Sequence, residues 1–404
     1  MAKVGRVVLA ALLTMMGTTV TAVAEPAPPL PPQWTGTWET APSGTAAALP
    51  GTAVRNVVHL SVGGTALRIR LSNRLGSAPL TLGAVTVAVR RATGPDAVPG
   101  TLRTATFHGA RTVTVPPGQD VLTDPVRLAV PDAADLLVTV LAPAGDGPVT
   151  YHGTALQTSY LSHDGAAHAA DEDGAAYTVT TNHWYYVTGV DVLGAAAGSV
   201  VAFGDSLTDG TGSTPDTDHR WPDRLAERLR PRGLGVLNAG VAGNRLLRDG
   251  TGPAALSRLD ADALSRAGVR VLIVLEGIND IKGTPRAEDA GAFADAYRTI
   301  VARAHAQGVR VIGATLTPYG GYAGFTATGE AVRQRVNAFI RTGGAFDAVA
   351  DFDAAVRDPA RPERILPAYD PGDHLHFDDA GMRVLADTVA ALFRAGAPQP
   401  AGHP

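Results

Sequence analysis

Short apolar stretches that alternate with polar residues mark the first half of the chain. Residues 67–71 alternate apolar and charged side chains, as a strand buried on one face does. The run at 57–62 is followed by Gly63-Gly64, which predicts a hairpin. Many short strands with Pro and Gly between them predict an all-β sandwich domain over residues 34–193. Further runs of this kind lie at 85–89, 112–115, 136–141 and 185–192.

The pattern changes near Gly198. A continuous apolar run at 200–203 is typical of a strand that is covered on both faces. Apolar residues at helical spacing follow it, and strands and helices then alternate up to a last helix with an N-cap at Asp378 that extends to about Arg394. This alternation predicts an α/β domain over residues 199–395, with a parallel sheet and helices on both faces, and ligands at the carboxyl ends of the strands. The expected strands are 236–237, 271–275, 309–314 and 348–352, and the expected helices include residues 221–229 and 293–304.

A candidate nucleophile lies directly after the first strand of this domain, in Gly204-Asp205-Ser206-Leu207. A serine at the end of a strand and just before a helix presents its hydroxyl at the rim of the sheet. The segment is not a G-x-S-x-G elbow, because Thr208 occupies the last position. On this segment alone, an N-cap or turn role is the more common one for a serine after a strand.

A candidate base precedes the last helix. In Asp373-His374-Leu375-His376, a carboxylate stands three residues from an imidazole, so that it could orient His376 towards Ser206. The same segment could be a solvated loop. It could also be a metal site, since His374, His376 and Asp370 lie close together in the sequence.

Two further segments follow strands and offer hydrogen-bond donors. Asn279, in Gly277-Ile278-Asn279-Asp280, could donate its side-chain N–H to a developing oxyanion. Gly240, in the segment 238–244, would let a backbone N–H approach the same oxygen. Each segment alone could be an ordinary turn, but all four are expected at one edge of one sheet.

These four segments, in this order, resemble the four sequence blocks of the SGNH or GDSL-type hydrolase family. The resemblance covers the chain from about Ser199 to Arg394, and the segment 201–229 also resembles a subfamily of arylesterases and polysaccharide acylhydrolases. It implies a three-layer α/β/α, flavodoxin-like catalytic domain that hydrolyses esters without a metal or other cofactor. It implies the catalytic triad Ser206, Asp373 and His376, with an oxyanion hole formed by Ser206, Gly240 and Asn279.

The termini and the composition bear on location and partners. Residues 1–24 read as a cleaved secretory signal peptide, with Lys3 and Arg6 before an apolar core and Ala22-Val23-Ala24 as the cleavage site, so we expect a secreted product without a stable membrane anchor. A Pro-rich linker follows at 25–33, and residues 396–404 form a tail. The absence of cysteine excludes disulfides and thiolate catalysis. A net charge of −4 without a basic stripe argues against nucleic acid. The oligomeric state is left open.

The substrate is expected to be a polysaccharide or small-molecule ester with a short acyl group, such as acetyl. Candidate substrate-binding residues are Arg245 and three aromatics of a glycine-rich loop, Tyr319, Tyr322 and Phe325. They could equally be an ion pair and the buried anchors of a surface loop. The alternatives are a lipase or lysophospholipase, and a carbohydrate-binding protein on a hydrolase fold. Aromatics of the first domain could stack on sugars or pack in its core; these are Trp34, Trp38, Trp184, Tyr185 and Tyr186.

Overall fold

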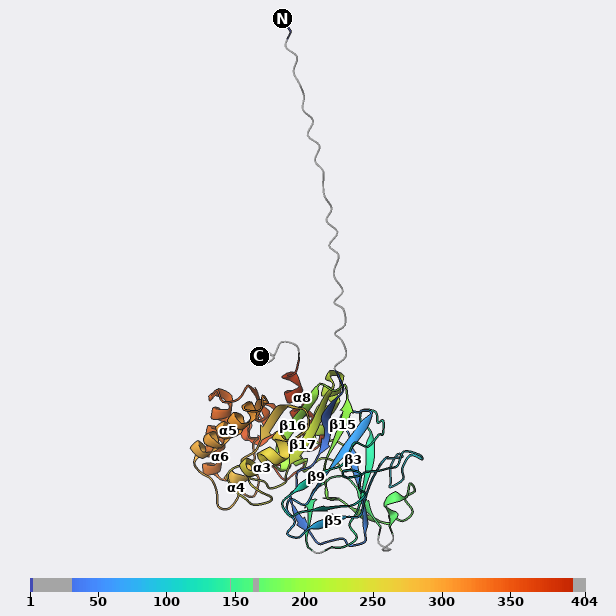
Figure 1. The fold of residues 1–404 in the computed structure, drawn as a ribbon. Helices are drawn as coiled ribbons and strands as arrows, with labels where there is room; N and C mark the ends of the chain where they lie inside the picture. Colours follow the sequence, from blue (N-terminus) through green and yellow to red (C-terminus); the bar gives the residue numbers. More distant parts are fainter. Residues whose placement is uncertain (3–30, 146, 163–166, 395–404) are drawn as a thin grey trace.

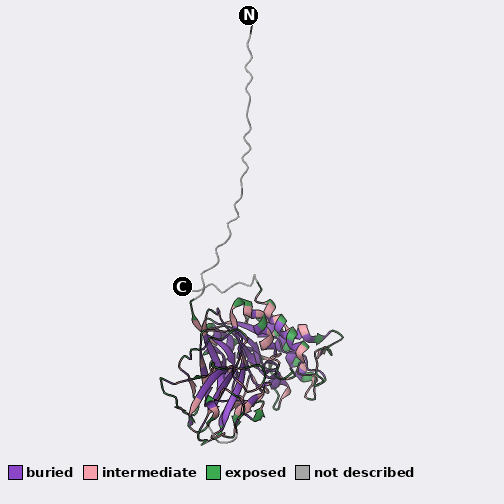
Figure 2. Cartoon of the chain, turned by 90° about the vertical axis from the view of Figure 1, so that its right-hand side faces the viewer, coloured by how far each residue is buried: buried purple, intermediate pink, exposed green. Residues whose placement is uncertain are grey.

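The computed structural model describes residues 1–2, 31–145, 147–162 and 167–394. The predicted tail, the predicted signal peptide beyond its first two residues, and most of the predicted linker lie outside the described residues. The chain has a β-rich part and an α/β part that lie side by side (Figure 1). Strands form the buried interior, and exposed residues lie mainly on helices and loops (Figure 2). None of the helices in these ranges combines the length and apolarity needed to span a membrane.

The β-rich part contains two larger antiparallel sheets. The first has the order β1-β15-β4-β9, and the second has the order β13-β12-β3-β10-β6-β7. The first comprises β1 (Gln33–Glu39), β15 (Val187–Gly194), β4 (Ala66–Ser72) and β9 (Asp120–Leu122). The second comprises β13 (Val179–Thr181), β12 (Ser159–Leu161), β3 (Ala53–His59), β10 (Asp135–Leu141), β6 (Ala84–Val89) and β7 (Arg103–Thr104).

Two smaller sheets complete this part. The order β14-β11-β2 forms a three-stranded sheet, and β5 pairs with β8. Their bounds are β14 (Trp184–Tyr185), β11 (Val149–His152), β2 (Gly44–Ala46), β5 (Leu80–Leu82) and β8 (Val113–Val115); a short 3₁₀ helix, η1, spans His168–Ala170.

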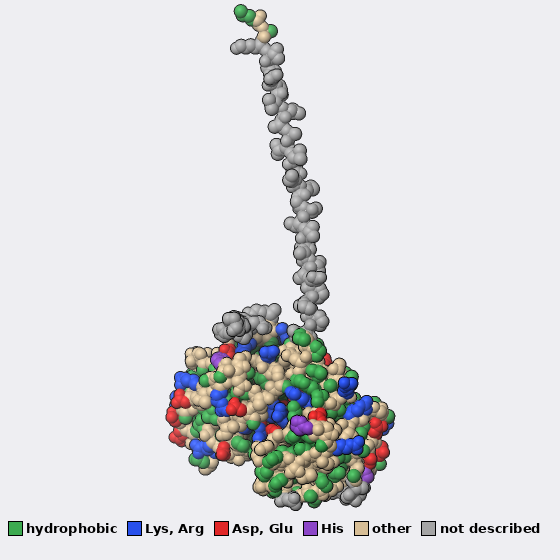
Figure 3. All heavy atoms as spheres, viewed as in Figure 1, with side chains coloured by type: hydrophobic (Ala, Val, Ile, Leu, Met, Phe, Trp, Pro, Cys, Tyr) green, Lys and Arg blue, Asp and Glu red, His purple; other side chains and the backbone are tan. Residues whose placement is uncertain are grey.

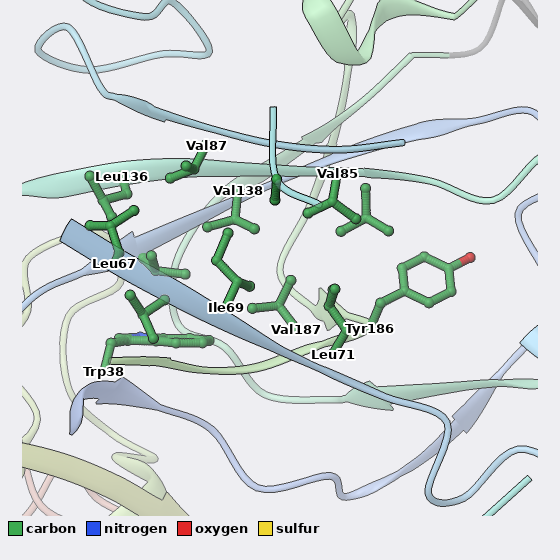
Figure 4. Close-up of a cluster of buried hydrophobic side chains, with 14 of the residues drawn as sticks. Trp38, Leu67, Ile69, Leu71, Val85, Val87, Leu136, Val138, Tyr186 and Val187 are labelled. Atoms are coloured by element: carbon green, nitrogen blue, oxygen red, sulfur yellow. The ribbon is translucent and has the colours of Figure 1, made fainter. Parts of the chain in front are cut away.

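One apolar cluster draws side chains from both larger sheets, including Ile69 of β4 and Val138 of β10 (Figure 4). The aromatics Trp38, Trp184, Tyr185 and Tyr186 belong to this cluster and are buried. They therefore pack in the core and are not available to stack on a sugar. Trp34 is half-buried beneath the Arg68 guanidinium, which lies 4.5 Å from its ring centroid.

The predicted hairpin at Gly63-Gly64 is wrong. Strands β3 and β4, which flank it, belong to different sheets, so the two glycines carry the chain from one sheet to the other. Gly64 forms an isolated bridge with Val130, and a Cβ on Gly63 would clash with the backbone around Pro131. Glycine is needed there for close backbone approach and not for a two-residue turn.

The α/β part is built on a five-stranded parallel sheet of order β17-β16-β18-β19-β20. With the strands numbered along the chain, this is the order 2-1-3-4-5, which is the flavodoxin-like arrangement. The strands are β16 (Gly198–Gly204), β17 (Leu234–Gly240), β18 (Val269–Leu275), β19 (Arg310–Ala314) and β20 (Ala348–Ala350).

Separate apolar clusters cover the two faces of this sheet. Alternate residues of β16 divide between them, with Val201 and Phe203 in one cluster and Val200 and Ala202 in the other. The first face is covered by α3 (Ala255–Leu259), α4 (Ile278–Lys282), α5 (Ala290–His305) and α6 (Ala327–Thr342). The second is covered by α2 (Trp221–Leu229), α7 (Phe352–Val356) and α8 (Asp379–Ala391). Shorter elements are α1 (Ser206–Asp209), η2 (Arg230–Arg232), η3 (Asp260–Leu264), β21 (Arg357–Asp358) and β22 (Arg361–Ile365).

Two ends of predicted elements differ from the structure. The fifth strand ends at Ala350, because the Asp351 carboxylate accepts the Ala354 N–H and caps α7. The last helix has the predicted N-cap, since Asp378 accepts the N–H groups of Ala380 and Gly381, but it ends at Ala391 and not near Arg394.

The β-rich part covers an edge of the parallel sheet. Strand β17 is the edge strand, and its Val236 N–H donates to the Ser61 hydroxyl at 2.9 Å. Gly36 of β1 donates its N–H to the Ala267 carbonyl at 2.9 Å. A Cβ on Gly235 would clash with the Gly36 carbonyl, so the two backbones pass very closely. The edge that would otherwise expose unpaired backbone groups is thereby closed. On the face shown in Figure 3, basic and acidic side chains are interspersed.

Candidate active site

The predicted site residues gather at the carboxyl edge of the parallel sheet. Ser206 follows β16 and is the first residue of α1, while Asn279 lies in α4, just beyond β18. The loop that follows β17 begins at Val241, and His376 lies two residues before the N-cap of α8. In sheets of this strand order, the crevice at the carboxyl ends is where ligands bind.

A serine, a histidine and an aspartate form a continuous hydrogen-bonded chain. The distance from Ser206 Oγ to His376 Nε2 is 3.0 Å, and the distance from His376 Nδ1 to Asp373 Oδ2 is 2.5 Å. With Asp373 as the acceptor at Nδ1, the tautomer that leaves Nε2 free can take the proton of the serine hydroxyl. The sequence separation between Ser206 and His376 shows that only the fold brings them together.

The loop around Asp373 is ordered by the same carboxylate. Its Oδ1 accepts the backbone N–H groups of Leu375 and His376, at 3.0 and 2.9 Å. Partial burial acts to raise the pKa of Asp373, but these N–H bonds and the His376 side chain outweigh it and hold the pKa below the ordinary value. Asp373 is therefore ionised at neutral pH, and it can stabilise positive charge on His376 during the reaction.

The serine is presented by a tight turn between strand and helix. Asp205 is the N-cap of α1, and its Oδ1 accepts the Leu207 N–H at 3.0 Å. A Cβ on Gly204 would clash with the Leu275 carbonyl and the Thr208 hydroxyl, so glycine is required where α1 folds back against the strands. Because Ser206 begins the helix, its backbone N–H has no partner within α1. No other group in the described ranges accepts a bond from it.

Asn279 is oriented by the loop that follows β17. Its Nδ2 donates to the Asn244 carbonyl at 2.8 Å, which fixes the amide and leaves its second N–H available. Asp280 holds the same loop by accepting the N–H groups of Leu246 and Leu247, at 2.7 and 3.1 Å. Asn279 thus keeps an N–H group free to donate, whereas Asp280 holds the loop in place.

The prediction that Gly240 supplies an oxyanion donor is wrong. Gly240 is the last residue of β17, and its N–H donates to the Asn238 Oδ1 at 3.0 Å. A Cβ there would clash with the Asp209 backbone, so the glycine serves close packing of β17 against α1. Gly243, three residues further on, has φ +82° and is half-buried, and its N–H makes no hydrogen bond within the described ranges. Gly243 is the glycine in this segment with a free donor.

A buried arginine of α3 forms hydrogen bonds to the ends of β16 and β17 and to the loop that follows β17. Arg258 of α3 donates to the carbonyls of Gly204 and Ala239 and to the side chain of Asn244, each at 2.8 Å. Its guanidinium lies 4.2 Å from the ring centroid of Phe203. One side chain therefore joins the ends of β16 and β17 to the residue whose carbonyl orients Asn279. A lone arginine in a short helix carries no sequence signal for this role.

Asp205, which directly precedes the nucleophile, and the nearby Glu276 are both buried acids. Burial raises the pKa of Asp205 to about 7 against the opposing effects of the Leu207 N–H and the Lys282 charge. Its Oδ2 has no hydrogen-bond partner among the described residues. Burial and the nearby Asp205 also raise the pKa of Glu276 well above its ordinary value. Below neutral pH Asp205 is therefore largely protonated, which fits a structural role beside the nucleophile.

We expect Asp205→Asn to change the pH dependence of stability. Asparagine keeps the acceptor for Leu207 but cannot ionise. Between about pH 4 and pH 7 the folded wild-type protein retains a proton on Asp205 that the unfolded chain has released. As the pH rises through this range, the free energy of unfolding of the wild-type protein therefore falls relative to that of the variant, by up to about 1.4 kcal/mol per pH unit. Urea unfolding of both proteins at pH 5 and pH 8 measures this. A stability difference that does not change with pH would contradict the raised pKa.

The four predicted substrate-binding residues divide into two groups. Tyr319 is fully buried in the core of the α/β part, so its assignment to substrate is wrong. Tyr322 and Phe325 are half-buried, with the Lys282 ammonium 4.8 Å from the Tyr322 ring centroid. Arg245 is also half-buried and donates to the Thr284 carbonyl at 3.2 Å.

The glycine-rich loop that carries these aromatics borders the catalytic loop. A Cβ on Gly321 would lie 3.0 Å from the His374 ring, and the Gly320 N–H donates to the Glu363 carbonyl at 2.6 Å. His374 is paired with Asp370, with 2.5 Å between Nδ1 and Oδ2, so the two histidines of the segment have separate carboxylate partners. Among the residues that the structure describes, the group compact enough to hold a metal is a different one, formed by His59, Asp135 and Asp218.

Comparison with known proteins defines the class. The sequence profile of the GDSL-like lipase/acylhydrolase family matches residues 202–384, which run from β16 into α8. This segment contains the Ser206–His376–Asp373 chain on a parallel sheet of the expected order, and it is a carboxylic ester hydrolase. The chain thus carries a domain of the GDSL-like lipase/acylhydrolase family, as the four sequence blocks predicted.

Several solved structures resemble about half of the chain. They include a GDSL-like lipase from Bacteroides thetaiotaomicron VPI-5482, with 15% identity over 49% of this chain and 89% of that chain and a TM-score of 0.37. An acetyl xylan esterase has 20% identity over 48% and 98%, with a TM-score of 0.36. An alpha/beta hydrolase enzyme from the metagenome of Lake Arreo, Spain, has 20% identity over 48% and 95%, with a TM-score of 0.38. A search of curated proteins finds no match.

Proposed function

We propose that this protein is a secreted serine esterase that removes short acyl groups, such as acetyl, from polysaccharide or small-molecule esters. The observation that carries the proposal is the hydrogen-bonded triad of Asp373, His376 and Ser206. In it, the serine hydroxyl lies 3.0 Å from the ring of a histidine that a carboxylate orients. A hydroxyl is a weak nucleophile near neutral pH, and this arrangement is what activates it.

The reaction then proceeds through an acyl-enzyme. Ser206 Oγ attacks the ester carbonyl carbon while His376 Nε2 takes the hydroxyl proton. The carbonyl oxygen becomes an oxyanion that accepts bonds from the free N–H groups of Ser206 and Gly243 and from the second Asn279 N–H. His376 returns its proton to the departing alcohol as the carbon–oxygen bond breaks. Water, deprotonated by His376, then attacks the acyl carbon. As the bond from that carbon to Ser206 Oγ breaks, His376 gives the proton to Oγ, and the acid and free Ser206 are released.

Preference for a short acyl group is supported by the way the neighbouring loop is held. Two adjacent glycines of this loop are closely packed, Gly320 against Glu363 and Gly321 against His374, which restricts the movement of the loop. The segment between β19 and α6 does not include an amphipathic helix that could act as a lid over a long chain. A fixed, lidless rim favours small acyl groups over fatty acyl chains.

Acyl preference is tested by comparing p-nitrophenyl acetate with p-nitrophenyl palmitate. We expect kcat/KM for the acetate ester to exceed that for the palmitate ester by at least about tenfold, since each misplaced methylene group in a pocket costs binding energy. Parallel assays on acetylated polysaccharides measure release of acetate. A clear preference for palmitate would favour the lipase or lysophospholipase alternative.

The remaining parts of the proposal concern domains and location. The two larger sheets of residues 34–193 are proposed to form a β-sandwich, supported by the apolar cluster they share (Figure 4). Residues 199–395 form the catalytic domain. Secretion is proposed on the sequence of residues 1–24 alone, with Lys3 and Arg6 before an apolar core.

A further inference from the structure

One side chain of the β-rich part reaches the nucleophile helix. His152 is the last residue of β11 and belongs to the three-stranded sheet β14-β11-β2. Its partner Asp209 is the last residue of α1, three positions after Ser206. The two side chains are 2% and 3% exposed, and His152 Nε2 lies 3.0 Å from Asp209 Oδ1. This contact is a buried ion pair between two parts of the chain that the sequence gives no reason to connect.

The His152 imidazole is held as a double donor. Its Nδ1 lies 2.7 Å from the Ala41 carbonyl, and its Nε2 faces the Thr154 carbonyl at 3.2 Å as well as Asp209. All these partners are acceptors, so both ring nitrogens carry hydrogen. Burial acts to lower the pKa of His152, but the Asp209 charge and these hydrogen bonds outweigh it and raise the pKa. The ring is further fixed by Trp184, with 5.6 Å between ring centroids.

The other oxygen of Asp209 holds the loop that carries the free glycine donor. Asp209 Oδ2 accepts the Ala242 N–H at 2.8 Å, and Ala242 directly precedes Gly243. The absence of a Cβ on Gly240 lets β17 approach the Asp209 backbone. The carboxylate therefore fixes the distance between α1, whose first N–H belongs to Ser206, and the loop that presents the Gly243 N–H.

We propose that His152 is a positioning residue of the active site, which acts through Asp209 to hold the Ser206 and Gly243 N–H donors in register for the oxyanion. The inference rests on the proposed esterase function. It makes the β-rich part a component of the catalytic machinery, because the group that orients Asp209 comes from outside the α/β part. Oxyanion stabilisation depends on donors that are already in place before the reaction, so a small displacement of the loop lowers turnover.

Two substitutions of His152 separate this role from simple packing. Glutamine places a donor near the former Nε2 and keeps the bond to Asp209, whereas asparagine places it near Nδ1 and keeps the bond to the Ala41 carbonyl. Both variants remove the imidazolium charge; His152→Asn also loses the two bonds made by Nε2, and His152→Gln loses the bond made by Nδ1. Thermal unfolding of both variants measures what these losses cost in stability. We expect His152→Asn to lower kcat by about 10–100-fold with KM changed by less than about threefold. His152→Gln should retain kcat within about threefold of the wild-type protein.

A second variant keeps the test valid if His152→Asn does not fold. In Asp209→Asn one acceptor oxygen becomes a donor, so either His152 or Ala242 loses its partner while the core of the β-rich part is left intact. We again expect a fall in kcat with little change in KM. Equal kcat values for His152→Asn and His152→Gln, or an undiminished kcat for Asp209→Asn, would overturn the inference. Ser206→Ala, assayed in parallel, tells the two proposals apart, because its retained activity would reject the esterase mechanism itself.

Discussion

We expect the replacement of Ser206 by alanine to lower kcat for p-nitrophenyl acetate by at least about 10³-fold. The alanine removes the hydroxyl that His376 can activate, whose oxygen lies 3.0 Å from His376 Nε2. The structural cost should be small, because the Ser206 hydroxyl makes that one hydrogen bond in the described part of the chain. KM should change little, because substrate binding does not need the hydroxyl.

A matched control is available seven residues further along the chain. Ser213 is also buried, and its hydroxyl donates to the Gly210 carbonyl at 2.8 Å, outside the triad. Ser213→Ala should cost about 1 kcal/mol of stability for the lost hydrogen bond and leave turnover within about threefold. If Ser206→Ala and Ser213→Ala had similar kcat values, Ser206 would not be the nucleophile.

The second large effect is expected at Asn279. Replacing Asn279 with alanine removes an oxyanion donor and should lower kcat by about 10²–10³-fold, with KM nearly unchanged, because the donor contributes mainly in the transition state. The variant also loses the bond to the Asn244 carbonyl, so thermal unfolding must be measured beside the kinetics.

Asparagine at this position can be compared with an exposed amide of the same domain. Gln334 of α6 bonds to Glu330 on the surface, and Gln334→Ala should leave kcat and stability essentially unaltered. A loss close to twofold in Asn279→Ala would remove this residue from the oxyanion site. The free N–H groups of Ser206 and Gly243 would then have to supply the stabilisation alone.

The sequence predicted the residues whose positions follow from where strands end. Ser206 and Asn279 come directly after apolar runs, and Asp373 and His376 precede the last helix, so a parallel sheet brings all four to one edge. Continuous apolar runs identified the buried strands, and the resemblance to the family blocks identified the residues that act at their ends.

The glycine of the oxyanion site could not be chosen from the pattern alone. Strand β17 extends as far as Gly240, in register with Gly204, and the side chain of Asn238 takes up the Gly240 N–H. Gly243, beyond the end of the strand, retains its donor because its φ of +82° turns the backbone away from the sheet. Which of the two glycines has an N–H group without a partner depends on where β17 stops pairing with β16. The amino-acid sequence does not show where that pairing ends.

The roles of residues that act through contacts with distant parts of the chain could not be predicted from the sequence either. Tyr319 lies in a glycine-rich loop that looks exposed, yet its ring is buried beside Phe325, with 5.1 Å between centroids. Arg258 and His152 lie in segments without any catalytic pattern, and they become informative only when the fold places them against the ends of β16 and β17 and against α1.

The most direct test of the triad is covalent labelling with a p-nitrophenyl phosphonate, followed by peptide mass spectrometry. The reagent transfers its phosphonyl group to an activated serine and releases p-nitrophenol, without the turnover that follows with an ester. We predict one phosphonyl group per chain, on the peptide that contains Ser206, and no labelling of Ser206→Ala. A label on another residue, or equal labelling of Ser206→Ala, would contradict the assignment of Ser206 as the group that His376 activates.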